Sequence, residues 1–210
     1  MKNIILAKRE IYHIYNRGVD KRKIFLNNHD YQRFTDSLSV FNDIKTLAGR
    51  HFNDLVDNPC KEPLVNVIAY CQMPNHFHLL LEQRAEDGIT KFLQKLTTSY
   101  TMYFNIKNKR TGALIQGVFK RSHIKTNPRL LEMSRYIHSN PIKILKNNGE
   151  TGRTISEQLL AYPWSSLPDY VGVREKSKII ENEKIILDQF PSRKAYAKYV
   201  LGETSDGGLT

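Results

Sequence analysis

The sequence has few cysteines and no long apolar run. Its two cysteines, Cys60 and Cys71, provide no disulfide framework and no CxxC pair, which fits a reducing cytoplasm. No stretch approaches the roughly twenty apolar residues that a helix needs to span a bilayer. Residues 1–9 are too briefly apolar for a signal peptide. We therefore expect a cytoplasmic protein with no membrane partner.

Acidic residues are also scarce relative to basic ones. The 210 residues include 32 Lys and Arg against 21 Asp and Glu, for a formal net charge of +11. This excess favours a polyanionic partner, most simply nucleic acid, but an anionic membrane surface or a ribosome-associated or merely basic protein would also fit it. The length supports one domain with an appendage, and it allows a proper core. We expect a domain at 1–150 and a basic, aromatic extension with a flexible tail at 151–210.

Hydrophobic periodicity indicates an α+β chain without internal repeats. The order of elements suggests a split βαβ, ferredoxin-like antiparallel sheet with helices on one face. A polar loop is expected at 45–61, and two short amphipathic segments are expected near the C-terminus, at 179–190 and 196–200. The expected strands are 10–17, 64–71, the segment that follows the turn at 73–75, and 112–119. The expected helices begin near residues 29, 90 and 127.

A short stretch after the turn at Pro74 and Asn75 is the centre of the functional argument. Residues two apart on a strand share a face, so His76 and His78 project to one side while Phe77 points into a core. Two imidazoles on a rigid strand make half of a divalent-metal site. The alternative is that one histidine caps the turn and the other is a satisfied, half-buried residue, because so short a pattern also occurs by chance.

A second stretch lies about sixty residues downstream. Asn127 as N-cap and Pro128 at the first position predict the start of a helix, which Pro141 ends or closely follows. Tyr136 and Asn140 are one turn apart and share a helical face. A tyrosine hydroxyl can be a nucleophile, and an amide oxygen can bind a metal. Alternatively, Tyr136 is a core aromatic residue and Asn140 is a C-terminal cap.

Together these stretches resemble the single-tyrosine HUH transposases, whose motif is His, bulky hydrophobe, His. The resemblance is closest to REP-associated tyrosine transposases, which act on repetitive palindromic sequences in bacterial chromosomes. It spans roughly residues 10–167, and the order and spacing of the blocks make it specific. The matching blocks are YHIYNRG at 12–18, MPNHFHLL at 73–80, YFN at 103–105, QGVFK at 116–120, RYIHSNP at 135–141 and YPWSS at 162–166.

The resemblance implies an HUH-endonuclease fold and a metal-dependent tyrosine transposase that cleaves and joins DNA strands. Tyr136 would form a 5′-phosphotyrosine intermediate and release a 3′-OH. His76, His78 and Asn140 would hold a divalent metal, Mg²⁺ or Mn²⁺. No nucleotide cofactor is expected, because the intermediate stores the energy of the broken bond. Tyr100 and Tyr103, the rival nucleophiles, lie on the apolar stripe of their helix and are expected in the core.

The implied partner is DNA, either single-stranded or a hairpin with a single-stranded flank, bound by a monomer or a dimer near the nucleoid. The candidate phosphate contacts are Arg17, Lys120, Arg121 and Lys143. For each of them, ordinary solvated charge is the competing interpretation. His138 is two residues from Tyr136, so it lies on another helical face and is not assigned to the metal.

Two other functions remain open at this point. A binding-only descendant of a transposase would hold hairpin DNA without cutting it, although retention of both histidines and Tyr136 argues against this. A nucleotide hydrolase of the histidine-triad type also has His-x-His on a strand, but it requires a third histidine where this sequence has Leu80.

Overall fold

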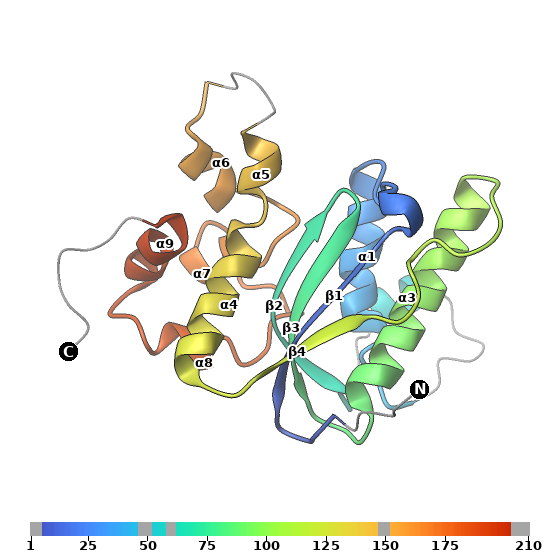
Figure 1. Cartoon of the computed structure of the whole chain (residues 1–210), viewed down its shortest axis with the longest axis horizontal. Coiled ribbons are helices and arrows are strands. Elements are labelled where there is room, and N and C mark those ends of the chain that lie inside the picture. Colours follow the sequence, from blue (N-terminus) through green and yellow to red (C-terminus); the bar gives the residue numbers. More distant parts are fainter. Residues whose placement is uncertain (1–5, 46–51, 58–61, 147–151, 203–210) are drawn as a thin grey trace.

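The centre of the computed structural model is a four-stranded antiparallel sheet (Figure 1). The structure describes residues 6–45, 52–57, 62–146 and 152–202. The strands are β1 (Ile11–Arg17), β2 (Val65–Met73), β3 (His76–Gln83) and β4 (Lys120–Ile124), and their spatial order is β2-β3-β1-β4. Because β3 lies between β1 and β2, these two strands are parallel in a split βαβ arrangement. The α+β, ferredoxin-like fold expected from the sequence is confirmed.

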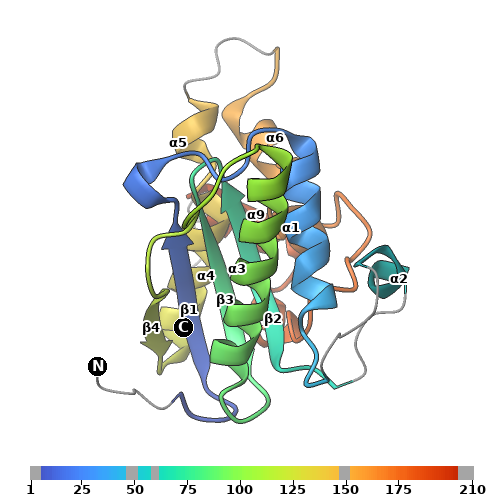
Figure 2. The ribbon, with the colours of Figure 1, turned by 90° about the vertical axis from the view of Figure 1, so that its right-hand side faces the viewer.

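Two long helices cover one face of the sheet (Figure 2). They are α1 (Asn28–Val40) and α3 (Gly88–Lys107), which also pack against each other. Phe77 points from β3 into this layer, where it is fully buried and its ring centroid lies 4.9 Å from that of Phe34. This confirms that Phe77 and the two histidines beside it face opposite sides of the sheet.

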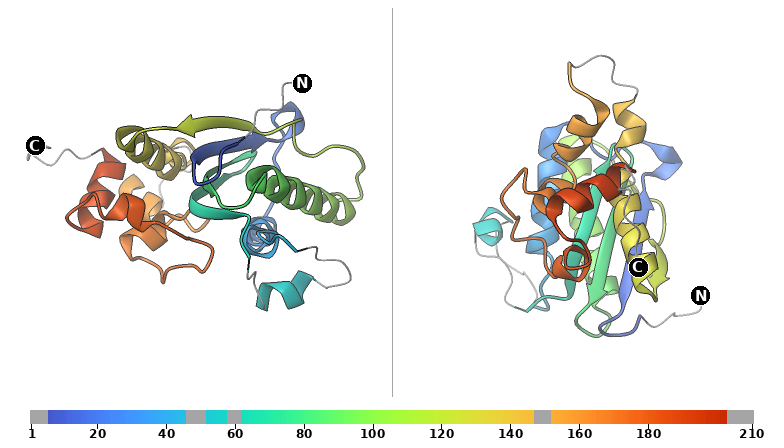
Figure 3. Two further views of the ribbon diagram at one scale, coloured as in Figure 1. Left: turned by 90° about the horizontal axis from the view of Figure 1, so that it is seen from below. Right: turned by 90° about the vertical axis from the view of Figure 1, so that its left-hand side faces the viewer.

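The other face is covered by α4 (Asn127–Ser139), as Figure 3 shows from below. The sequence had predicted helices on one face only, so this second layer is a correction. The apolar side of α4, which includes Leu130, Met133 and Ile137, is buried. On its outer side α4 contacts α8 (Lys184–Leu187) and α9 (Arg193–Leu201). The helix is therefore enclosed between the sheet and the C-terminal segments.

The chain after α4 returns to the free edge of β2. The Gln72 amide donates to the carbonyl of Trp164 at 2.8 Å, and the Ser166 amide donates to the carbonyl of Tyr70 at 3.0 Å. The Trp164 ring also stacks on Tyr31 at 4.9 Å. These contacts protect the edge of a strand that is buried at all nine positions. The short helices are η1 (Val19–Lys21), α2 (Phe52–Asp57), α5 (Ile142–Leu145), α6 (Ile155–Leu160) and α7 (Leu167–Val171).

Some local predictions were wrong. The strand expected at 112–119 forms only an isolated bridge through Ile115, and the real strand begins at Lys120, because Gly112 and Gly117 adopt positive φ angles of 83° and 51° that interrupt an extended backbone. The N-cap of α4 is Thr126, one residue before the predicted Asn127, and its side chain accepts from the Arg129 amide.

The expected loop at 45–61 contains α2, and its remaining residues 46–51 and 58–61, with Cys60, lie outside the described residues. The predicted tail at 203–210 lies outside them too. In the segment 179–190 only α8 is helical. Of the helices that the structure describes, none is long and apolar enough to cross a membrane. The proposed boundary at residue 150 stays a prediction.

Candidate active site

The two histidines of β3 lie on the face of the sheet that α4 covers. In the register of β1 against β3, Arg17 is opposite His76 and Tyr15 is opposite His78. Cross-strand partners share a face, and so do residues two apart on one strand. The face therefore carries His13, Tyr15 and Arg17 from β1 beside His76 and His78 from β3. All of these side chains project from the two central strands of the sheet.

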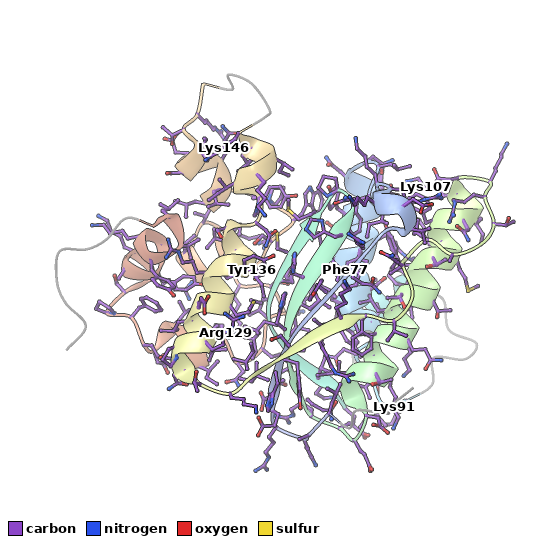
Figure 4. All side chains as sticks on the ribbon, in the orientation of Figure 1. Phe77, Lys91, Lys107, Arg129, Tyr136 and Lys146 are labelled. Carbon is purple, nitrogen blue, oxygen red and sulfur yellow. The ribbon has the colours of Figure 1, made fainter. Side chains whose placement is uncertain are left out.

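Tyr136 reaches this face from α4. A single residue, Lys125, separates the end of β4 from the N-cap of α4, so the strand fixes where the helix begins. The Tyr136 ring lies edge-on to His78, with the ring centroids 5.4 Å apart and the planes at 87°. Tyr136 remains 44% exposed, so a substrate can reach part of the residue. Figure 4 shows Tyr136 on the side of α4 that adjoins the sheet.

Both histidines of the motif are held in the neutral form. Burial, together with the neighbouring His13, His76 and Lys143, lowers the pKa of His78 to about 2. Burial also lowers the pKa of His76, whose Nδ1 lies 2.7 Å from the Asn75 Oδ1. Neutral imidazole is the form that binds metal ions. The protein therefore presents two neutral imidazole rings beside each other at neutral pH.

Asn140 connects the end of α4 to His76. Its Nδ2 donates to the Tyr136 carbonyl at 2.9 Å, so Asn140 does act as the C-cap of the helix. This leaves its Oδ1 for other partners, and a hydrogen bond between Asn140 and His76 works against the lowering of the histidine pKa. The cap interpretation and the ligand interpretation are therefore compatible, because the amide nitrogen bonds the helix and the amide oxygen stays available.

The donor set suits a hard or borderline divalent ion. Within the described ranges, no three His, Cys, Asp or Glu side chains are grouped so as to hold a metal. A site here would consequently need an amide oxygen beside the two imidazoles, and Asn140 supplies one. Two neutral nitrogens and one oxygen are ligands that Mn²⁺ and Mg²⁺ accept when water and phosphate oxygens complete the coordination. The residues present thus fit the ion that the sequence predicts.

His13 is the residue that the sequence reasoning missed. Its Nε2 lies 2.9 Å from the Nδ1 of His78, and it is buried with 5% exposure. Alternation along residues 10–17 placed His13 and Tyr15 on one side of a strand, but only the pairing of β1 with β3 brings that side to His78. His13 lies in the block at 12–18 that resembles the transposase family, but a single sequence does not show which strand lies beside this block.

The four basic candidates separate into two groups. Arg17 lies opposite His76 and donates from Nε to Gln116 at 2.7 Å, and exposed Lys120 lies opposite Tyr15. The charge of Lys143 lowers the pKa of both motif histidines, which places it near them. Arg121, in contrast, is opposite Ile14 and so faces the side covered by α1 and α3. The structure brings three of the four to the histidine face and leaves Arg121 away from it.

The rival residues lie elsewhere. Tyr100 is fully buried and donates to the Ile24 carbonyl at 2.6 Å, while the Tyr103 hydroxyl lies 2.9 Å from Asp30. Both belong to α3, on the other side of the sheet. His138 is buried between the Tyr196 hydroxyl at 2.6 Å and the Ser166 hydroxyl at 2.7 Å. None of these three side chains joins the cluster around His78.

Known proteins resemble this chain both in sequence and in fold. The sequence model described as "Transposase IS200 like" matches residues 9–140, which include both histidines, Tyr136 and Asn140. Among solved structures, a REP-associated tyrosine transposase bound to a REP hairpin is similar, with a TM-score of 0.55 and 16% identity. The alignment covers 86% of this chain and 89% of that one, and at this identity it supports the fold. No curated protein matches the sequence.

Proposed function

Because the chain belongs to the family of IS200-like transposases, we propose that it cuts and rejoins DNA strands with Tyr136 as the nucleophile. One observation carries this proposal: half-exposed Tyr136 lies edge-on to the buried, neutral ring of His78, which has His76 beside it on the same face of the same chain. The other tyrosines considered, Tyr100 and Tyr103, have hydroxyls that are already hydrogen-bonded on the opposite side of the sheet, where Tyr100 is buried and Tyr103 is half-buried.

The reaction breaks one P–O bond as it forms another. The Tyr136 oxygen attacks a backbone phosphorus, its proton is released, and the departing 3′ oxygen takes up a proton to become a 3′-OH. The product is a 5′-phosphotyrosine. Attack of a 3′-OH on this linkage reverses the step and joins strands, so no nucleotide cofactor is consumed. A divalent ion held by His76, His78 and Asn140 would supply charge neutralisation at the phosphate.

The residues of the chain have distinct tasks in this scheme. The Asn140 side chain bonds the Tyr136 carbonyl and so fixes the last turn of α4 on which the nucleophile lies. Lys143, Arg17 and Lys120 surround the histidine face and would bind the phosphates that flank the cleaved bond. Arg121 remains a candidate for contacts on the opposite side of β4 only.

We further propose that the substrate is a DNA hairpin with a single-stranded flank, as in REP-type palindromes. The similar structure contains a hairpin of this kind, and the net charge of +11 suits a phosphate backbone. Cleavage by an in-line tyrosine requires an accessible phosphate, which a single-stranded flank provides. Such a substrate would place the protein in the cytoplasm, at the nucleoid.

The decisive experiment mixes the purified protein with labelled hairpin DNA that carries single-stranded flanks, in Mn²⁺ or Mg²⁺. We expect a covalent adduct on a denaturing gel, with the nucleotide mapped to the peptide that contains Tyr136. An adduct on another tyrosine would refute the assignment. Tight hairpin binding without any adduct, across both metals and several flanks, would instead support a transposase descendant that only binds.

A further inference from the structure

We propose that His13 is a positioning residue, which fixes the ring of His78 in the tautomer and orientation that metal binding requires. The proposal rests on the metal site described under the proposed function and adds a residue to it. His13 lies on β1, a central strand, so its backbone is held by neighbours on both sides. It does not bind the substrate in this scheme, because its side chain is 5% exposed.

The geometry of the pair is that of a direct hydrogen bond between two rings. The Nε2 of His13 lies 2.9 Å from the Nδ1 of His78. The ring planes differ by 15°, and the ring centroids are 5.1 Å apart. His78 thus has one nitrogen occupied by a protein partner and its other nitrogen, Nε2, free of that bond. A ring fixed in this way has one nitrogen left with which to bind an ion.

The tautomers follow from the chemistry of neutral imidazole, which has one donor and one acceptor nitrogen. For His78 to bind a cation through Nε2, that nitrogen needs its lone pair, so the proton must be on Nδ1. His13 must then accept this proton at its Nε2 and carry its own proton on Nδ1. In the reverse arrangement the proton of His78 would occupy Nε2 and block coordination. His13 therefore selects which nitrogen of His78 is available.

The surroundings fix the ring of His13 in place. Tyr15 stacks on both rings, with centroids 5.1 Å from His13 and 5.7 Å from His78. Tyr136 lies edge-on to His13 at 5.9 Å. His13 thus sits behind both the candidate ligand and the nucleophile, as outer partners of metal ligands do.

The first test uses the unaltered, metal-free protein. Long-range ¹H–¹⁵N NMR spectra distinguish the two protonation states of each imidazole. We expect His78 to be protonated on Nδ1 and His13 on Nδ1. A His78 ring protonated on Nε2, or an even mixture of tautomers, would overturn the proposal. This measurement needs no variant, so it stands even if substitutions at His13 disturb folding.

The second test measures Mn²⁺ affinity by titration calorimetry or electron paramagnetic resonance, without DNA. His13→Phe keeps a ring but removes the acceptor, and we expect affinity to fall about 10–100-fold. His13→Gln offers an amide oxygen as acceptor and should recover most of this loss. His123→Phe is the matched control, because His123 lies on β4 facing the other side, beside Tyr12 and Glu10. It should leave affinity unchanged.

The outcomes separate this proposal from the proposed function. Unchanged Mn²⁺ affinity in folded His13→Phe overturns the positioning role, even if the unaltered protein forms the tyrosine adduct. Reduced affinity with recovery in His13→Gln supports it, even if no cleavage is found. Failure of the unaltered protein to bind Mn²⁺ overturns the metal site and the positioning role together, while the adduct assay still decides the nucleophile.

Discussion

The rings of Tyr136 and His78 meet edge to face, with their centroids 5.4 Å apart and their planes at 87°. One ring comes from the helix that follows the last strand, and the other comes from the centre of the sheet. An aromatic edge against a neutral imidazole face is a favourable contact. It holds the tyrosine beside His78 while the residue stays 44% exposed.

Tyr136→Phe should abolish the covalent adduct and cleavage while leaving hairpin binding intact. The hydroxyl has no hydrogen-bond partner among the described residues, so its removal should change the free energy of unfolding by no more than about 0.5 kcal/mol. Adduct gels, a binding titration and denaturant unfolding measure the three quantities. Tyr103→Phe is the control that should still form the adduct. Cleavage by Tyr136→Phe would disprove the assignment.

An equimolar mixture of His78→Ala and Tyr136→Phe should stay inactive. The contact between these two residues lies within one chain, so neither variant contains a complete site and neither can complete the other. The assay is adduct formation on hairpin DNA after the two proteins have been mixed, denatured and refolded together. Recovery of about a quarter of normal activity would show instead that α4 is exchanged between two copies of the chain.

His78→Ala should lose cleavage and weaken Mn²⁺ binding strongly, because one of only about three protein ligands disappears. The chain should still fold, at a cost of about 1–3 kcal/mol, since His78 is buried and its removal leaves His13 without its partner. Calorimetry with Mn²⁺ and denaturant unfolding check the two effects. Full cleavage by the folded variant at matched Mn²⁺ would remove His78 from the mechanism.

Stability should fall as the pH drops from 7 to 5. Burial lowers the pKa of His138 to about 3, of His13 to about 4 and of His78 to about 2, whereas an unfolded chain titrates near 6.5. Below pH 6.5 the unfolded state therefore binds protons that the folded state does not bind. Linkage puts the loss at pH 5 at roughly 2 kcal/mol for each such histidine.

Denaturant unfolding at pH 7 and pH 5, in the presence of a chelator, tests this pH dependence. His29→Gln, at an exposed position near the start of α1, is the control that should show the same decrease. Equal stability at both pH values would mean that the buried rings already carry protons in the folded protein. It would also remove the argument that His78 is ready to bind a cation at neutral pH.

Lys120→Ala should weaken hairpin binding and make it less sensitive to salt. Removal of one phosphate contact lowers the slope of log affinity against log salt concentration by about one. Lys91→Ala is the matched control, because Lys91 lies near the start of α3, far from Tyr136 in Figure 4. Equal slopes for both variants would show that Lys120 is solvated charge. The unaltered protein should also prefer flanked hairpins to plain duplex throughout the salt titration.

Much of this fold could be predicted from features that act over a few neighbouring residues of the sequence. Pro74 and Asn75 fix a turn, alternation fixes which side His76 and His78 face, and Pro141 ends the tyrosine helix. These features depend on neighbours within a few residues. The glycines at 112 and 117 were the exception, because their positive φ angles replaced the predicted strand with a loop.

The parts that could not be predicted depend on pairing between distant segments. His13 joins the site only because β1 pairs with β3 in one register, and Arg121 leaves it for the same reason. A shift of one residue in the β1–β3 pairing would turn His13 away from His78, and the same shift in the β1–β4 pairing would bring Arg121 to the histidine face. The second helical layer could not be predicted either, because the pattern of an amphipathic helix does not determine which face of a sheet it will cover.

The short link at Lys125 and the enclosure of α4 between the sheet and the C-terminal helices have a consequence for strand exchange. A helix tied to a strand at one end and packed on both sides cannot carry its tyrosine to a distant DNA end. In the proposed reaction, the incoming 3′-OH would therefore have to travel to a phosphotyrosine that stays in place on the protein. Exchange of partners would then depend on movement of the DNA alone, and the sequence and length of the flanking single strand would decide which ends can meet.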